Sequence, residues 1–266
     1  MFAPEFDYHK ANSVAEAIQL LDANDEAKLI AGGHSLIPLL KLRLARPTAL
    51  IDIAGIADLK RITVNNGIVR IGALATHWDI ASSRDVEHAC SMLTEVAGGI
   101  GDPHVRNRGT IGGSIANNDP AADYPSAVVG LGATVKTNKR EISGDEFFTA
   151  LFETALEPGE IVTSVSFPVP DKAAYQKFGN PASRYAIVGV MLSSGSAGVR
   201  VAITGAGPCV FRQGDMEKAL AGSFSADAVT GVTVSADGLN SDIHASAKYR
   251  AHLVGVMAKR AVDACA

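Results

Sequence analysis

Two glycine pairs constrain this chain more than any other feature of its sequence. The first glycine turn, residues 31–35 (Ala-Gly-Gly-His-Ser), follows a short apolar run, and the second glycine turn, residues 110–114 (Thr-Ile-Gly-Gly-Ser), follows a polar loop. Because glycine lacks a Cβ, the backbone N–H groups beside it can approach an anion closely, and a helix that starts there adds a favourable dipole. Two such turns predict a site in which one diphosphate is bound from opposite sides. A single glycine pair, however, is also typical of an ordinary turn.

The common nucleotide-binding motifs are absent from the sequence. Neither G-x-G-x-x-G nor G-x-x-x-x-G-K-[ST] occurs anywhere in the 266 residues. This argues against a nucleotide site of the Rossmann or P-loop kind.

Charge and hydropathy exclude two classes of partner. The chain has 24 basic and 28 acidic side chains, scattered along it, and a formal net charge of -4. This distribution offers no basic surface for nucleic acid. The apolar runs are shorter than the roughly 18 residues that span a bilayer, and the first residues lack a basic-then-apolar signal. We therefore expect a cytoplasmic protein with no membrane insertion and no nucleic-acid partner.

The cysteines and histidines predict no metal site in this chain. Cys90, Cys209 and Cys265 are widely spaced and form no C-x-x-C motif, so we expect reduced thiols, and four compact ligands for an iron-sulfur cluster are lacking. His34 has no second histidine or carboxylate at ligand spacing, so we expect it to pack and hydrogen bond. His77 and Trp78 are expected to fill a helix start.

Hydrophobic periodicity divides the chain into three stretches. The first, which begins with a capping box at Ser13–Glu16, predicts a small β-α-β-α-β unit with helices at 14–23 and 36–44 and strands at 29–31 and 50–53. The second predicts a hairpin (61–64 and 68–71) turned by Asn65-Asn66-Gly67, helices near 77–82, 85–97 and 121–131, and strands at 134–137 and 161–167. The third predicts strands at 186–192 and 199–204 and helices at 214–221 and 245–263.

Three strings carry a resemblance to a known family. They are AGGHSLIPLLKLRL (31–44), VRNRGTIGGSIANNDPAADYP (105–125) and EIVTSVSFP (160–168). They resemble the flavin subunit of the molybdenum hydroxylases, the family of xanthine dehydrogenase and carbon monoxide dehydrogenase. Residues 175–178, 183–188 and 249–253 resemble the carboxy-terminal domain of the same subunits, so the likeness covers nearly the whole chain.

The resemblance implies an α+β fold built on a vanillyl-alcohol-oxidase (PCMH-type) FAD-binding domain. This domain would comprise one lobe at residues 1–56 and a second lobe at 57–170. A domain with an antiparallel sheet and helices would follow at 171–266.

The resemblance also implies which residues bind the cofactor. The two glycine turns match the loops around the FAD diphosphate, with their backbone N–H groups as the main donors. Asp123 matches the acid that accepts from the adenosine ribose hydroxyls, Ile161 and Val162 match apolar neighbours of the cofactor, and Lys177 matches a cation near the flavin. The implied cofactor-binding residues are Ala31, Gly32, Gly33, His34, Ser35, Leu36, Thr110, Ile111, Gly112, Gly113, Ser114, Asp123, Ile161, Val162 and Lys177.

Several of these assignments have structural alternatives. Asp123 is also typical of a helix first turn, and Lys177 of a solvated surface. Arg106 and Arg108 are consistent with phosphate binding, with a contact to a partner chain or with a purely structural role. Tyr185 is consistent with stacking near the flavin or with packing alone.

The function implied by the resemblance is electron transfer in a complex. A large subunit with a molybdenum-pterin cofactor would oxidise substrate, a small subunit with 2Fe-2S clusters would relay electrons, and FAD on this chain would pass them to an external acceptor. We expect a dimer of heterotrimers and no catalytic side chain in this subunit, because the flavin carries the chemistry. The alternatives are a self-contained FAD oxidoreductase of the same flavin fold and a flavin-free scaffold subunit.

Overall fold

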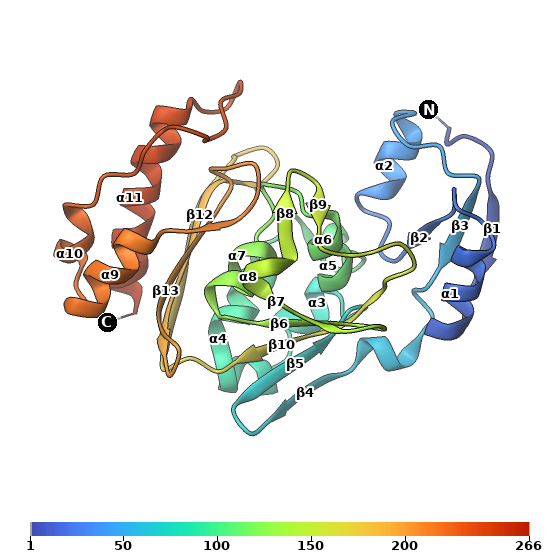
Figure 1. The fold of residues 1–266 in the computed structure, drawn as a ribbon, viewed down its shortest axis with the longest axis horizontal. Helices are drawn as coiled ribbons and strands as arrows, with labels where there is room; N and C mark the ends of the chain where they lie inside the picture. Colours follow the sequence, from blue (N-terminus) through green and yellow to red (C-terminus); the bar gives the residue numbers. More distant parts are fainter. Residues whose placement is uncertain (1, 266) are drawn as a thin grey trace.

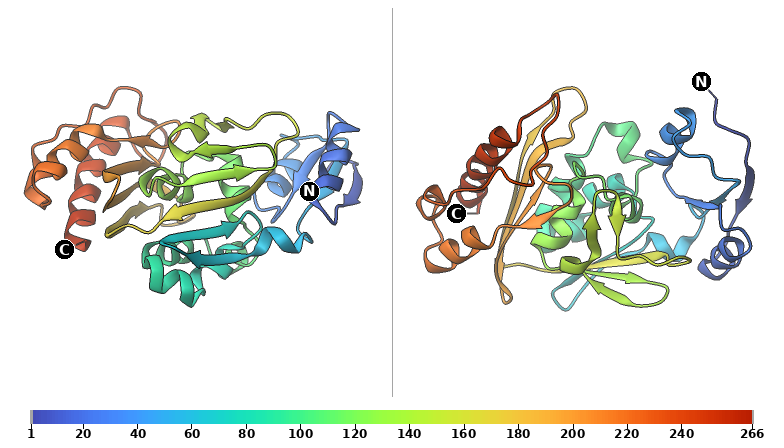
Figure 2. Two further views of the ribbon diagram at one scale, coloured as in Figure 1. Left: turned by 60° about the horizontal axis from the view of Figure 1, so that its bottom comes forward. Right: turned by 45° about the horizontal axis from the view of Figure 1, so that its top comes forward.

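A computed structural model describes residues 2–265, so Met1 and Ala266, the end residues of the first and last predicted domains, lie outside the described part. The fold is α+β. Three main sheets follow one another along the long axis of the molecule, from the N-terminal lobe to the C-terminal helices (Figure 1, Figure 2).

The N-terminal sheet has three parallel strands in the order β1-β3-β2. The strands are β1 (Asp7–Lys10), β2 (Lys28–Ile30) and β3 (Ala49–Asp52), and the connecting helices are α1 (Val14–Asp22) and α2 (Leu36–Lys41). This arrangement confirms the predicted β-α-β-α-β unit. Helix α1 begins as the capping pattern predicts, since the Glu16 N–H donates to Ser13 Oγ over 3.1 Å.

The central sheet is antiparallel, with strand order β4-β5-β10-β6-β7. Its strands are β4 (Ile62–Asn65), β5 (Ile68–Gly72), β6 (Thr134–Thr137), β7 (Glu141–Ser143) and β10 (Val162–Pro168). The predicted hairpin is confirmed, because Asn66 and Gly67 have φ angles of 50° and 72°, as a tight β-turn of the primed type needs.

Short helices and a small two-stranded sheet surround the central sheet. They are a 3-10 helix (Ala57–Lys60), α3 (His77–Ala81), α4 (Arg84–Gly98), α5 (Pro103–Arg106), α6 (Ile111–Asn117), α7 (Tyr124–Gly130), α8 (Gly144–Phe147), β8 (Phe148–Ala150) and β9 (Glu153–Thr154). Helix α4 is kinked at Cys90, which has a non-helical φ of -157°. Helix α7 is shorter than predicted, and α6 was not predicted, because two glycines weaken the helical pattern of its sequence.

The third sheet is antiparallel, with its strands in chain order. It comprises β11 (Lys172–Gly179), β12 (Ala186–Gly195), β13 (Gly198–Thr204) and β14 (Phe211–Arg212), followed by α9 (Gly214–Gly222), α10 (Ala226–Thr230) and α11 (Ala247–Ala264). Helices α9 and α11 pack against the sheet, and Figure 1 shows them on its outer side. Helices α4 and α7 of the central region also contact this sheet.

The buried side chains form two cores. The smaller core lies in the N-terminal lobe and includes Ala17, Ile51, Leu74 and Ile161. The larger core is continuous from β5 to α11. The described residues include no helix that is long and apolar enough to cross a membrane. All three cysteines are free.

Candidate functional site

A cleft of about 1180 Å³ separates the N-terminal lobe from the rest of the chain. Its walls come from the end of β2 and the start of α2 on one side, and from α6 and the loop before β10 on the other. The volume is somewhat above the range of about 300–1,000 Å³ that is typical of small-molecule sites, so the cleft has room for a large cofactor. Both glycine turns line the cleft, as the sequence predicts.

The first glycine turn contacts the segment that leads into the second. A Cβ at position 32 would lie 2.1 Å from the Arg108 carbonyl oxygen and 3.0 Å from the Gly109 Cα. Only glycine allows this approach, because real Cβ contacts are never so short. Gly32 therefore fixes the first turn against the segment that leads into the second.

The first glycine turn presents unused backbone donors. Within residues 2–265, no backbone or side-chain acceptor takes the N–H groups of Gly32, Gly33, His34 or Ser35. Gly33 has a φ of +76°, which reverses the chain between β2 and α2. Consecutive free N–H groups in such a turn form an anion-binding concavity.

The second glycine turn has no free donor between Ile111 and Ser114. The N–H groups of Ile111 and Gly112 donate to the carbonyls of Ala75 and Ala73 over 3.1 and 2.9 Å. The Gly113 N–H donates to Thr110 Oγ1 over 3.1 Å, and the Ser114 N–H donates to the Thr110 carbonyl over 3.0 Å. The expectation that both turns offer backbone donors is therefore wrong for the second turn, which can contact a ligand through its hydroxyls.

Asp123 lines the cleft but already has two donors. The Tyr175 hydroxyl donates to Oδ1 over 2.5 Å, and Lys177 Nζ donates to Oδ2 over 3.1 Å. Burial raises the pKa of the Asp123 carboxyl, and the Lys177 charge and the Tyr175 hydroxyl oppose that rise. A carboxylate has about four lone-pair sites, so Asp123 can still accept from a ligand hydroxyl.

Lys177 does not line the cleft. Its ammonium group donates to Asp123 and, over 2.9 Å, to the Gly99 carbonyl. The structure thus places Lys177 behind Asp123, where it holds the carboxylate in position. The solvated-surface alternative is wrong, because only 16% of the Lys177 side chain is exposed.

The remaining predicted residues divide into those at the cleft and those inside the core. Leu36, Ile161 and Val162 line the cleft, whereas Ile111 is fully buried beneath the second turn and does not. Tyr185 also lines the cleft and is 48% exposed. Arg106 donates to the carbonyls of Ile100 and Gly101, which supports its structural role.

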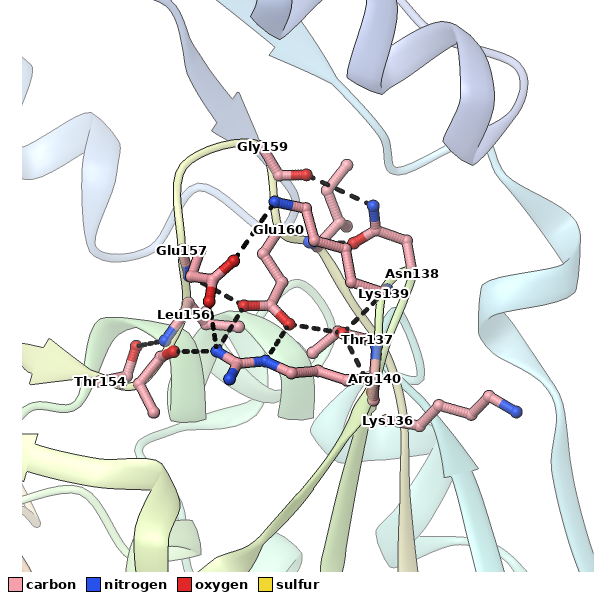
Figure 3. A network of polar contacts seen from close by, with 12 residues as sticks. Lys136, Thr137, Asn138, Lys139, Arg140, Thr154, Leu156, Glu157, Gly159 and Glu160 are labelled. Carbon is pink, nitrogen blue, oxygen red and sulfur yellow. Dashed lines mark hydrogen bonds and ion pairs between the residues drawn. The ribbon is translucent and has the colours of Figure 1, made fainter.

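Sequence reasoning missed a buried carboxylate beside the cleft. Glu160 precedes Ile161 and accepts from Arg140 Nε over 3.0 Å, from the Thr137 hydroxyl over 2.7 Å and from the Glu157 N–H over 2.8 Å (Figure 3). The Arg140 hydrogen bond is the main reason that the pKa of Glu160 falls to about 2. This network anchors the loop that carries Ile161 to the cleft. The sequence signal that could have indicated this carboxylate is a glutamate that follows a Pro-Gly turn and directly precedes a predicted strand.

His77 was expected to fill a helix start, and it does so as the first residue of α3. It is also 4% exposed, lies at the cleft and packs beside Tyr124 in a tilted arrangement, with ring centroids 5.3 Å apart. Burial, followed by the nearby His34 and Arg106, lowers the pKa of His77 to about 4. The ring is therefore neutral at physiological pH.

Comparison with known families identifies the kind of protein. The family described as the FAD binding domain in molybdopterin dehydrogenase matches residues 4–170, which is more than half of the chain. The chain belongs to this family. The α+β architecture is therefore that of an FAD-binding subunit of the molybdenum hydroxylases, and the chain is a subunit of that class of oxidoreductase.

Relatives match along almost the full length. The chain is 36% identical to the carbon monoxide dehydrogenase medium chain of Hydrogenophaga pseudoflava, with 99% of this chain and 98% of the relative covered. It is 33% identical to the nicotine 6-hydroxylase medium subunit of Paenarthrobacter nicotinovorans, with 98% of each covered. The structure of quinoline 2-oxidoreductase from Pseudomonas putida 86 matches with a TM-score of 0.90, at 29% identity, over 100% of this chain and 98% of that one.

The residues present fit FAD. The four free N–H groups of the first turn suit a diphosphate, and Gly113 leaves the second turn bare on one side, since a Cβ there would meet only Thr110 Oγ1 at 2.9 Å. Apolar Leu36 and Ile161 supply walls for flat rings. When bound, the flavin supplies the redox chemistry, and the chain contributes binding and orientation.

Proposed function

We propose that this chain carries non-covalent FAD and transfers electrons from the 2Fe-2S clusters of a small partner subunit to an external acceptor. A large subunit with a molybdenum-pterin cofactor would oxidise the substrate. The observation that carries the proposal is the cleft itself, which both glycine turns line and where the backbone N–H groups of the first turn have no acceptor within residues 2–265. The chain's part would be to bind and orient the cofactor.

The proposed site uses the residues of both lobes. The first turn and the hydroxyls of Thr110 and Ser114 would hold the diphosphate, and Asp123 would accept from the ribose hydroxyls. Ile161 and Val162 would pack on the cofactor, while Lys177 would act through Asp123. We propose the division into lobes at 1–56 and 57–170 and a carboxy-terminal domain at 171–266 as the frame of this site.

A partner must approach the cleft if electrons arrive from another subunit. Helix α2 starts at the first glycine turn, and Leu42 and Leu44 directly after it are 56% and 72% exposed. Exposed leucines on a segment next to the cleft favour a protein contact there. Within residues 2–265, no group of three or more His, Cys, Asp or Glu side chains is placed to hold a metal ion.

Purification of the complex from its source tests this proposal. Native mass spectrometry is expected to show a dimer of heterotrimers with FAD on this chain, and the visible spectrum of the separated chain is expected to be that of a flavin. The separated chain is expected to show no substrate-dependent dye reduction. A flavin-loaded monomer or homodimer as the only species would contradict the assembly, and a flavin-free chain would contradict the cofactor.

A further inference from the structure

His77 carries a polar atom that the protein leaves without a partner. Its Nδ1 is buried, and nothing within residues 2–265 hydrogen bonds it; the same holds for the neighbouring Tyr124 hydroxyl. A buried polar atom without a partner costs stability, so such an atom next to a ligand cleft requires a reason. Tyr124 does not line the cleft, whereas His77 does.

The opposite edge of the His77 ring lies at the meeting point of the two glycine turns. The His77 backbone N–H donates to the Gly109 carbonyl over 3.0 Å. A Cβ at position 109 would lie 2.5 Å from His77 Nε2 and 2.9 Å from Cδ2. Glycine at 109 therefore leaves room for the ring at the segment that Gly32 of the first turn also contacts. His77 Nε2, unlike Nδ1, is not a buried atom without a partner, and both His77 and Gly109 line the cleft.

The tautomer follows from this placement. The ring is neutral, so one nitrogen carries a proton and the other accepts. If Nδ1 carried the proton, its N–H group would be buried without an acceptor. If Nε2 carries the proton, the N–H group lies beside the cleft. We infer that Nε2 carries the proton and is a donor.

The surroundings leave a role for a side-chain donor. The second turn has committed its backbone N–H groups from Ile111 to Ser114, so donors on that side of the cleft must be side chains. Burial, followed by the nearby His34 and Arg106, disfavours the charged form of His77, so the ring offers one N–H group as a neutral donor.

We propose that His77 is a ligand of the cofactor, with its Nε2–H donating a hydrogen bond to an oxygen of the FAD diphosphate. This inference rests on the proposed function, since it requires FAD in the cleft. It assigns to His77 the donor role that the backbone of the second glycine turn cannot fill.

Binding measurements on the full chain test the proposal. The variants are His77→Phe, which keeps the ring against Tyr124 but removes both nitrogens, and His77→Gln, whose amide nitrogen takes the place of Nε2. Because a hydrogen bond to a charged group is lost, His77→Phe is expected to weaken binding of FAD and of ADP by about 10- to 100-fold. His77→Gln is expected to stay closer to the wild type. Tyr124→Phe, which removes the other unpartnered atom nearby, is expected to bind FAD and ADP as the wild type does.

The outcomes separate this inference from the proposed function. If the wild-type chain binds no FAD, the proposed function fails. If the wild type binds FAD and ADP but His77→Phe binds both equally well, only the role of His77 fails. An equal loss in Tyr124→Phe would also overturn it, because the effect would then be one of packing.

Nitrogen NMR of the wild-type chain provides a readout that needs no variant to fold. With ¹⁵N-labelled histidine, His77 is expected to show the Nε2-protonated tautomer, and its Nε2–H resonance is expected to shift when ADP is added. An Nδ1-protonated ring, or an Nε2–H resonance that ADP leaves unchanged, would overturn the proposal.

Discussion

The two glycine turns have nearly the same sequence pattern but use their backbones differently. In the first turn, the N–H groups of residues 32–35 have no acceptor in the described part of the chain, and Gly33 has a positive φ. In the second turn, the N–H groups of residues 111–114 all have protein acceptors, and Gly112 packs against Ala73. The first turn thus keeps its donors available for a ligand, whereas the second uses its donors to hold the cleft wall in place.

This difference shows that a glycine motif has no fixed role. What decides the role is whether neighbouring strands supply acceptors. The loop after β5, with the carbonyls of Ala73 and Ala75, lies under the second turn and takes its donors. The first turn has no such neighbour within the described residues, so its donors remain available for a ligand.

The largest expected effect concerns the structural role of Gly112. A Cβ there would lie 2.6 Å from the Ala73 Cβ and 2.7 Å from its carbonyl oxygen, so Gly112→Val is expected to lower the free energy of unfolding of the FAD-free chain by about 3 kcal/mol or more. Urea unfolding measures this change. Gly113→Val is the matched control and is expected to cost less, because the Cβ would meet a single side-chain oxygen, Thr110 Oγ1 at 2.9 Å, and no backbone atom of a neighbouring segment. Equal stability of the two variants would remove the distinction between the turns.

The second prediction separates binding from stability in the first turn. Ser35 is the N-cap of α2 but makes no side-chain capping bond. Ser35→Asp is expected to weaken FAD binding by about 100-fold, because a carboxylate beside the diphosphate repels it. In the absence of FAD, the Ser35→Asp chain is expected to be as stable as the wild type or more stable by up to about 1 kcal/mol, because aspartate is a good N-cap.

Fluorescence titration and thermal unfolding together test this prediction. Ser35→Asn, which is neutral and similar in size, is the control and is expected to bind FAD nearly as the wild type does. Full FAD affinity in Ser35→Asp would show that the diphosphate does not lie at the first turn.

The third prediction is smaller and concerns the Glu160 network. The pKa of the Glu160 carboxyl is lowered from 4.5 to about 2. The ionised carboxylate therefore stabilises the folded chain fully above about pH 4.5, and this stabilisation is lost as the pH falls toward 2. Because Arg140 is partly exposed, Glu160→Gln is expected to cost only about 1 to 2 kcal/mol at pH 7. Denaturant unfolding at pH 7 and pH 3 is expected to show the difference from the wild type shrinking at pH 3. A difference that is independent of pH would assign the effect to packing.

Much of the fold could be predicted from local patterns. The hairpin at Asn66-Gly67 and the long C-terminal helix follow from turn chemistry and apolar periodicity. Strand β1 was not located, because all four of its residues are exposed and it is held by backbone pairing with β3. Strand β11 was missed because only Ala174 among its residues is fully buried, so it shows no clear alternation.

The position of the two glycine turns at one cleft could be predicted from the sequence, but their contacts could not. The glycine pairs and their hydroxyls predicted two turns at one cleft, and the structure places them there. The sequence did not reveal that the carbonyls of Ala73 and Ala75 accept hydrogen bonds from N–H groups of the second turn, or that Lys177 lies behind Asp123. Both features depend on contacts between segments that are far apart in the sequence. The burial of His77 beside Gly109 could not be predicted for the same reason, since it depends on the tertiary packing of α3.

Amide NMR of the full chain during titration with ADP tests the central claim most directly, because ADP carries a diphosphate and each backbone N–H is observed separately. The amide protons of Gly32, Gly33, His34 and Ser35 are expected to move downfield as they form hydrogen bonds to the phosphates. Those of Ile111, Gly112 and Gly113 are expected to move much less, because they keep their protein acceptors. Large downfield shifts in the second turn, with none in the first, would contradict the account.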